Sequence, residues 1–325
     1  MCETTNNRQK GENNNDPLKN TPLRPPQGGI SDEDLEKSPF EGGAGDVLMD
    51  KYEIAYAPSV SMLRFTLNRQ ASPLNHLFGA ANPTKDLAFT DTEVRGIRKQ
   101  FDSAQILWHD KAIKSAVLEH AGRGNVVHFS CHGSFQYDNP LDSMLILAGG
   151  DKDKKKNLTL KEIFANLKLQ EAALVTLSAC ETGMVKLESG DEYIGLPSGF
   201  LYAGASAVIS SLWAVSDIST SFLMQRLYEN IITKKMGKAA VLREAQQWVR
   251  DLTVRDIRPD IEQAAESLEQ MKKQAESEEK TETSYYRKLR ADIRSLKAAL
   301  RRDGNEQPFR HPWHWGAFMC TGNWN

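Results

Sequence analysis

Residues 173–179 spell ALVTLSA and residues 125–130 spell NVVHFS. Both runs are short, apolar and rich in β-branched or aromatic side chains, which is typical of strands buried inside a parallel sheet. Apolar residues at helical spacing precede each run, over 112–121 and again after Thr159. This alternation predicts the α/β class: a central, mostly parallel sheet flanked by helices.

Further elements follow the same alternation. Thr90 with Glu93, and Thr159 with Glu162, match the capping box that opens a helix. A helical turn over 196–205, a strand over 207–212 and a helix with Asp217 as N-cap are expected next. The short segments 52–57 and 60–65, separated by Pro58, are expected to be extended.

The chain divides into a tail and one folded domain. Residues 1–45 contain almost no large apolar side chains, so they are expected to be a disordered N-terminal tail. Residues 46–325 form the domain, which closes on the aromatic strand HPWHWGAFMCTG at 311–322. Within it, residues 255–305 are dominated by Glu, Lys, Ala, Gln and Arg, which predicts a helical hairpin or short coiled insertion.

Bulk properties exclude several functions. The formal net charge is -2, and without a basic stripe no nucleic acid or anionic membrane is expected as a direct partner. The N-terminus has no apolar signal segment, and no apolar run is long enough to span a membrane, so we expect a cytoplasmic protein. Four scattered cysteines, Cys2, Cys131, Cys180 and Cys320, suit a reducing compartment with free thiols.

Two expected strand ends carry residues with catalytic chemistry. His132 and Gly133 follow NVVHFSC, and Cys180 follows ALVTLSA. A thiol attacks a carbonyl as the thiolate, so an imidazole that accepts its proton, and later protonates the leaving amine, is the minimal machinery for amide hydrolysis. The backbone N–H groups of Gly133 and Cys180 could stabilise the oxyanion. A cysteine and a histidine alone are weak support, since a buried cysteine is usually a small apolar residue.

Four ordered motifs make the catalytic interpretation much more specific. They are VVHFSCHGSF (126–135), LSACETG (177–183), GDEYIGLPSGFLYAGASAVISSLWAVSD (190–217) and HPWHWGAFMCTG (311–322), preceded by YAPSVSML and LFGAANP. From about Tyr52 to Gly322 the chain resembles the CHAT domain, a bacterial branch of the caspase and separase clan of cysteine peptidases.

The resemblance implies a caspase-like sandwich and a cysteine endopeptidase that needs no cofactor. The histidine of the family's H-G pair matches His132, and the nucleophile of its S-A-C-E-T-G motif matches Cys180. The amides of Gly133 and Cys180 match its oxyanion hole. A third orienting residue is not reliably required in this clan, and none is assigned here.

The resemblance also suggests where a substrate binds. In separase-like relatives an acidic residue after the L-W-x-V strand receives a basic side chain, and Asp217 matches it, although Asp217 is equally suited to be a helix N-cap. Trp213 resembles an aromatic residue at the pocket rim, while a tryptophan on a strand is more often core. The backbone of Ser211 and Leu212 could pair with an extended peptide. Weaker candidates for the acidic role are Asp142, Asp191 and Glu192.

Two other interpretations compete with the protease. A metal site from His128, Cys131 and His132 is disfavoured, because Cys131 faces the opposite side of a strand and no Cys-x-x-Cys pair supplies further ligands. His311 and His314 are expected to pack or cap. The alternative function is a non-catalytic, caspase-like interaction or regulatory scaffold, for which the insertion offers a docking surface.

Partners are suggested by the resemblance alone. Such bacterial proteases act in defence systems on a specific protein encoded beside them, including gasdermin-like proteins and proteins of RNA-guided complexes. The N-terminal helical repeats that usually sense a partner in this family are not evident in the sequence. A regulatory protein partner, the insertion or the tail is therefore expected to control activity.

Overall fold

The protein is described from a computed structural model that covers residues 48–69, 73–87, 89–150, 152–179, 182–188, 192–277, 290, 293–294 and 296–325. These residues belong to the unit Ala44–Asn325. The predicted disordered tail, 1–45, lies outside the described residues, and so does Cys180.

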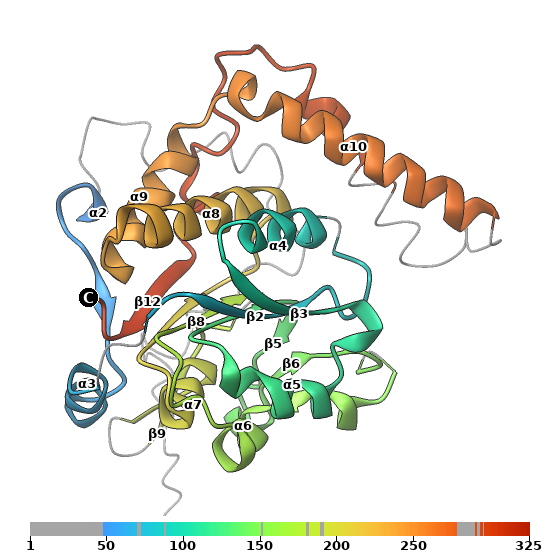
Figure 1. Ribbon diagram of the computed structural model, residues 1–325. Helices are drawn as coiled ribbons and strands as arrows, with labels where there is room; N and C mark the ends of the chain where they lie inside the picture. Colours follow the sequence, from blue (N-terminus) through green and yellow to red (C-terminus); the bar gives the residue numbers. More distant parts are fainter. Residues whose placement is uncertain are drawn as a thin grey trace, which may run out of the picture. The chain divides into compact units, whose positions relative to one another are not determined.

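A central sheet of seven strands organises the domain (Figure 1). Every neighbouring pair is parallel except β11 with β12. This agrees with the predicted α/β class and its mostly parallel sheet. The strand order is β1 (Ala55–Tyr56), β12 (Phe318–Gly322), β11 (Ala207–Ser211), β8 (Leu174–Ser178), β4 (Val126–Ser130), β2 (His76–Ala81) and β3 (Ser103–Trp108).

Helices cover both faces of this sheet (Figure 1). One face carries α4 (Thr90–Arg98), α8 (Asp217–Glu229), α9 (Lys238–Asp251) and α10 (Val254–Ser277). The other face carries α5 (Lys114–His120), α6 (Leu160–Asn166) and α7 (Leu196–Ala203). The short helices α2 (Leu48–Lys51) and α3 (Val60–Leu67) precede the first long strand.

Strand β4 illustrates how the sequence builds two cores. All five of its residues are buried, and successive side chains point to opposite faces. Val126 therefore packs with the α4 and α8 side, while Val127 and Phe129 pack with the α6 and α7 side. A strand that is apolar on both faces is what a helix-covered parallel sheet requires.

Two small antiparallel sheets extend from the central one. The first contains β5 (His132–Ser134), β6 (Met144–Ile146) and β7 (Leu158–Thr159), and the second contains β9 (Lys186–Glu188) and β10 (Glu192–Ile194). The first of them follows β4 directly, so it carries the chain from the end of that strand into the candidate site.

Two predictions of extended structure were wrong. Residues 60–65 are helical within α3, because the hydroxyl of Ser59 accepts a hydrogen bond from the Met62 N–H and caps the first turn. The aromatic segment 311–322 is a strand only over β12, since Pro312–His314 forms a single 3-10 turn. The imidazole of His311 caps that turn by accepting a hydrogen bond from Trp313 N–H.

Helix α10 and the segment after it pack on the outer side of α8 and α9. Ile257, Ile261 and Leu268 of α10 are buried together with Ile293 and Leu296 of the returning chain. Lys297 on the return forms a 2.6 Å ion pair with Glu269 of α10. Within the described residues, no helix combines the length and the apolar character needed to cross a membrane.

Candidate active site

The candidate site lies where β4 and β8 end side by side. The two strands are parallel neighbours, and Ser130, the last residue of β4, pairs with Ser178, the last residue of β8. His132 is two residues beyond Ser130, and Cys180 is two residues beyond Ser178 in the sequence. The expected meeting of these two side chains is not tested, because Cys180 lies outside the described residues.

The residues on both sides of Cys180 are anchored to β11. The carbonyl of Ala179 accepts hydrogen bonds from the Thr182 hydroxyl at 2.9 Å and from the Ser211 hydroxyl at 2.7 Å. Gly183 N–H donates to the Ser211 carbonyl at 2.6 Å. The chain that enters and leaves the Cys180 segment is therefore tied to a central strand.

The imidazole of His132 is held by a carboxylate. Its Nε2 lies 2.9 Å from Oδ1 of Asp86, and both side chains are about one third exposed, at 30% and 33%. Because an ionised carboxylate only accepts hydrogen bonds, Nε2 is assigned as the protonated nitrogen. In the neutral ring Nδ1 then carries the lone pair, so it is the atom that can take a proton from a thiol.

Asp86 belongs to the loop between β2 and α4, and Asn82 fixes that loop. The Asn82 side chain is buried, donates to the carbonyl of Leu87 at 3.0 Å and accepts from Leu87 N–H at 3.2 Å. Its backbone takes a φ of 47°, a left-handed conformation that asparagine tolerates better than most residues. The hydroxyl of Thr84 donates a hydrogen bond to Asp86.

A buried polar cluster underlies this edge of the sheet. Glu93 of α4 is 2% exposed, and its carboxyl group lies 2.9 Å from His128 Nε2 and accepts from the Ser178 hydroxyl at 3.2 Å. The other His128 nitrogen lies 3.2 Å from the hydroxyl of Tyr228, which donates to Thr176 at 2.9 Å. Burial raises the pKa of Tyr228, so this hydroxyl stays protonated.

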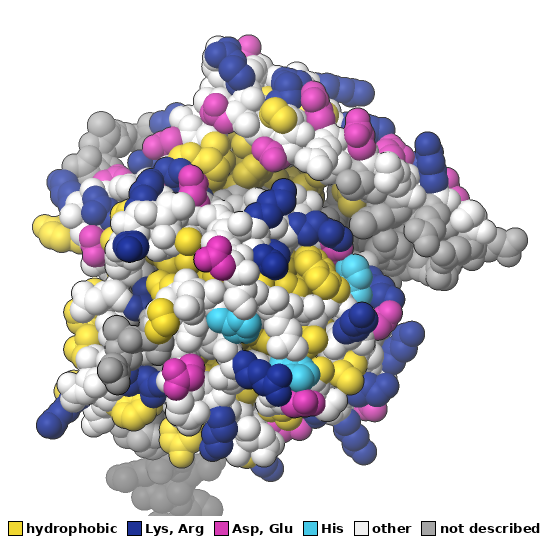
Figure 2. Space-filling model, viewed as in Figure 1, with side chains coloured by type: hydrophobic (Ala, Val, Ile, Leu, Met, Phe, Trp, Pro, Cys, Tyr) yellow, Lys and Arg dark blue, Asp and Glu magenta, His cyan; other side chains and the backbone are white. Residues whose placement is uncertain are grey.

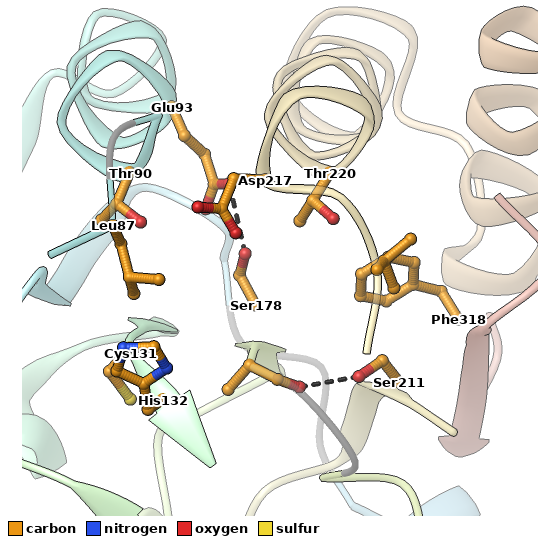
Figure 3. A pocket seen from close by; sticks show the side chains of 12 residues that line it. Leu87, Thr90, Glu93, Cys131, His132, Ser178, Ser211, Asp217, Thr220 and Phe318 are labelled. Atoms are coloured by element: carbon orange, nitrogen blue, oxygen red, sulfur yellow. Dashed lines mark hydrogen bonds between the residues drawn. The ribbon is translucent and has the colours of Figure 1, made fainter. Parts of the chain in front are cut away.

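A cavity opens beside His132, between the first turns of α4 and α8 (Figure 3). Leu87, Val215 and Phe318 supply apolar walls, and the side chains of Glu93 and Asp217 reach into it from the two helices. Its volume is about 30 Å³. That is room for roughly one water molecule.

Asp217 does not act as the predicted N-cap. Ser216 occupies the N-cap position, and Asp217 is the first residue of α8. The Asp217 side chain lines the cavity beside His132. The helix itself begins where the sequence predicts.

The other predicted binding residues have internal partners. Ser211 lines the cavity, but its N–H lies 3.4 Å from the Thr182 hydroxyl and its carbonyl accepts from Gly183, so a peptide pairing there would have to displace these bonds. Trp213 stacks on Trp313 with ring centroids 5.7 Å apart and donates its indole N–H to the Trp313 carbonyl. Gly133 lies in β5, paired in register with Leu145 of β6.

The side chains considered as metal ligands, His128, Cys131 and His132, lie in different environments. Cys131 is buried in the apolar cluster with Phe129, while His128 faces Glu93 and Tyr228 on the opposite side. Within the described ranges, no group of three or more His, Cys, Asp or Glu side chains is arranged to hold a metal ion.

Two carboxylates of the site were missed by sequence reasoning. Thr90 and Glu93 match a capping box in sequence, yet Glu93 turns inward to His128 and the helix has no side-chain cap. A fully polar T-x-x-E motif gives no sign of this. Asp86 lies in a polar loop, and only its tertiary contact with His132 distinguishes it.

The solved structures that match this chain include cysteine proteinases. The separase–securin complex of Saccharomyces cerevisiae matches with a TM-score of 0.45 and 19% identity, covering 60% of this chain and 13% of that one. The Arg-specific cysteine proteinase gingipain R matches with a TM-score of 0.42 and 9% identity, covering 77% and 46%. A complex of the pro- and mature domains of Porphyromonas gingivalis RgpB matches with a TM-score of 0.41 and 9% identity, covering 85% and 51%.

The chain thus spans only a small part of separase and about half of gingipain R. No match was found among curated proteins. The family comparison is far more extensive, because the CHAT domain matches residues 30–323, nearly the whole chain. Because this match covers nearly the whole chain, the chain belongs to the CHAT domain family.

Proposed function

We propose that this protein is a cysteine endopeptidase in which Cys180 is the nucleophile and His132 is the general base and acid. The observation that carries the proposal is the hydrogen bond from His132 Nε2 to Asp86, which leaves Nδ1 as the proton acceptor. Strand β8 supports it, because its last residue pairs with Ser130 and leads to Cys180 two positions later.

The reaction follows from ordinary thiol chemistry. Nδ1 of His132 takes the proton of Cys180, and the thiolate sulfur bonds to the peptide carbonyl carbon. The C–N bond then breaks as the imidazolium returns its proton to the leaving amine. Water attacks the resulting thioester, loses its proton to His132 and releases the acid and the free thiol.

Two supporting roles complete the mechanism. Gly133 N–H and Cys180 N–H are the proposed donors to the oxyanion, where removing one such donor commonly costs 10²- to 10³-fold in rate. Asp86 is proposed as a positioning residue. It holds the imidazole in one tautomer and favours the imidazolium that forms during the reaction.

We further propose that the cavity receives a basic side chain before the scissile bond. Asp217 and the buried Glu93 supply negative charge, and Leu87, Val215 and Phe318 match the aliphatic part of lysine or arginine. Ser211 forms part of the cavity wall, and Trp213 is proposed as the aromatic residue at the rim of the substrate site. A basic side chain needs more than 30 Å³, so the cavity walls must move when substrate binds.

The substrate is proposed to be a specific partner protein, encoded beside this one and acting in bacterial defence, with a gasdermin-like protein among the candidates. This step rests on the resemblance to CHAT proteases. A regulatory protein that opens the cavity is part of the same proposal.

Incubation of the purified protein with the proteins encoded beside it, followed by sequencing of the new termini, tests this function. We expect one dominant cut after lysine or arginine, absent with Cys180→Ala and weakened by Asp217→Asn. Cleavage that persists with Cys180→Ala rules out the assigned nucleophile. Stable binding without any cut would favour the non-catalytic scaffold.

A further inference from the structure

A second and much larger hollow lies between α8, α9 and the first turns of α10. Its volume is about 530 Å³, and it is lined mainly from these three helices. Apolar side chains gather between α10 and the body of the molecule on the face drawn in Figure 2, with both acidic and basic side chains around them. We call this hollow the α10 groove.

The floor of the α10 groove is aromatic. Phe222 of α8 and Trp248 of α9 meet edge to face with ring centroids 6.5 Å apart, and both are only partly buried. Phe222 also contacts Phe309, at 6.1 Å between centroids. Partly exposed aromatic rings in a concavity are typical anchors of protein interfaces.

The charges around this floor are unbalanced. Four carboxylates line the groove, from Glu229, Asp251, Asp256 and Asp260, against the single lining guanidinium of Arg226. Glu229 forms an ion pair with Arg226, and Asp251 forms one with Arg250, which is not among the lining residues. The Arg226 guanidinium donates hydrogen bonds to the carboxylates of Glu244 and Glu229, and these bonds raise its pKa. Asp260 is exposed and forms no ion pair within the described part of the chain.

We propose that the α10 groove docks a basic segment of a partner protein, with a large apolar side chain on the aromatic floor and lysine or arginine beside the four carboxylates. Charge complementarity favours a basic partner segment over the other possible occupants of the groove. A second copy in a symmetric dimer would place the same acidic surface against itself. Residues 1–45 of this chain carry eight acidic and five basic side chains, so they also complement the groove poorly.

The groove and the candidate active site share two helices. Asp217 and Thr220 of α8 line the cavity beside His132, and Phe222 and Glu229 of the same helix line the groove. Helix α4 likewise carries Glu93 at the cavity and leads to Gln100 at the groove. A segment docked in the groove therefore contacts the same helices that line the small cavity beside His132. Its influence on the opening of that cavity rests on the proposed function.

Peptide display on the full chain tests the docking directly. Random dodecapeptides are selected on the wild-type protein, and one selected peptide is measured by fluorescence anisotropy against Asp260→Lys and the control Glu266→Lys. Both positions are exposed on α10, and Glu266 is not among the groove residues. The two variants therefore carry the same change of charge on one helix.

We expect the selected peptides to be basic, with an aromatic or long aliphatic residue, and their affinity to fall as salt rises. Asp260→Lys should weaken binding by about fivefold or more, and Glu266→Lys by less than about twofold. Neutral or acidic peptides, or equal binding to both variants, would overturn the proposal. If the protein instead self-associates and Asp260→Lys abolishes that self-association, the occupant of the groove is a second copy of this chain, and the proposal of a partner protein is wrong.

Adding the selected peptide to an assay of Cys180 labelling tests the coupling separately. Binding with faster labelling supports both steps. Binding without any change in labelling leaves the docking site intact and refutes the regulatory step.

Discussion

The two nitrogens of the His132 imidazole have different surroundings. Nε2 is bonded to Asp86, so the ring can rotate little without losing a charge-assisted hydrogen bond. The carboxylate thereby selects which nitrogen is basic. At this scale the sequence was informative about His132, which a motif marks, and uninformative about Asp86, whose role depends on a contact across 46 positions.

Asp86→Asn should lower kcat by roughly 10- to 1,000-fold while KM changes little, because the carboxylate contacts His132 and lies on the far side of the ring from the thiol in the proposed arrangement. Steady-state kinetics on a cleaved peptide measures both constants. Asp102→Asn, at an exposed position of the loop after α4, is the matched control. Equal kcat in the two variants would remove Asp86 from the mechanism.

A second histidine gives a test of stability. Burial, together with smaller contributions from the nearby charges of His311 and Arg302, lowers the pKa of His314 to about 4. In the unfolded chain the pKa returns to about 6.5. Between these values the unfolded state binds more protons, so stability rises with pH across this window and falls as the solution is acidified.

When the pH falls from 7 to 5, the titration of His314 should lower the free energy of unfolding by about 2 kcal/mol. His314→Phe removes the titration, so the variant should lose less stability over that interval than the wild type. Urea unfolding at the two pH values measures the difference. The same loss in both proteins would show that His314 is not held neutral by the fold.

At the scale of elements, the sequence predicted those with a local signal. The capping box of Thr159 and Glu162 forms as expected and opens α6. Strands β4, β8 and β11 are continuous apolar runs and were predicted. Residues 60–65 were misassigned because Pro58 and the apolar pattern suggested a strand, while the decisive Ser59 cap is one hydrogen bond. No sequence prediction covered β3, whose residues are mostly half-buried.

The loop between β2 and α4 depends on Asn82. Asn82→Ala removes the side-chain hydrogen bonds to Leu87 and retains a left-handed backbone that alanine disfavours, so it should cost about 2–3 kcal/mol. Asn82→Gly loses the same bonds but tolerates the conformation, and should be less destabilised by about 1 kcal/mol. Chemical denaturation of both variants measures this order. If alanine is tolerated as well as glycine, backbone strain does not contribute.

On the scale of the whole molecule, strand order positions the site. From β2 the chain passes to β3 on one side and then to β4 on the other, so the loops after β2 and β4 border a crevice at the carboxyl ends of the strands. Parallel sheets bind ligands at such switch points. The α/β pattern of the sequence predicted the sheet, but not its order, because order is set by packing across both faces.

The Glu93 cluster joins both central strands to α4 and α8. Glu93→Ala leaves His128 and Ser178 buried without their shared acceptor, and should cost about 3–5 kcal/mol of unfolding free energy. Glu93→Gln keeps the shape and one acceptor, so its cost should be smaller. Urea titration of both variants checks this, and a change below about 1 kcal/mol for alanine would show that the cluster does not support the fold.

The central claim is that His132 activates the thiol of Cys180. Treating the protein with an arginine-based acyloxymethyl ketone peptide and locating the label by mass spectrometry tests it directly. Cys131 is buried, and burial raises the pKa of Cys320 to about 12, so neither should react. The account predicts label on Cys180, formed about 100-fold more slowly in His132→Ala. Label on Cys131 or Cys320 in place of Cys180, or an unchanged rate in that variant, would contradict it.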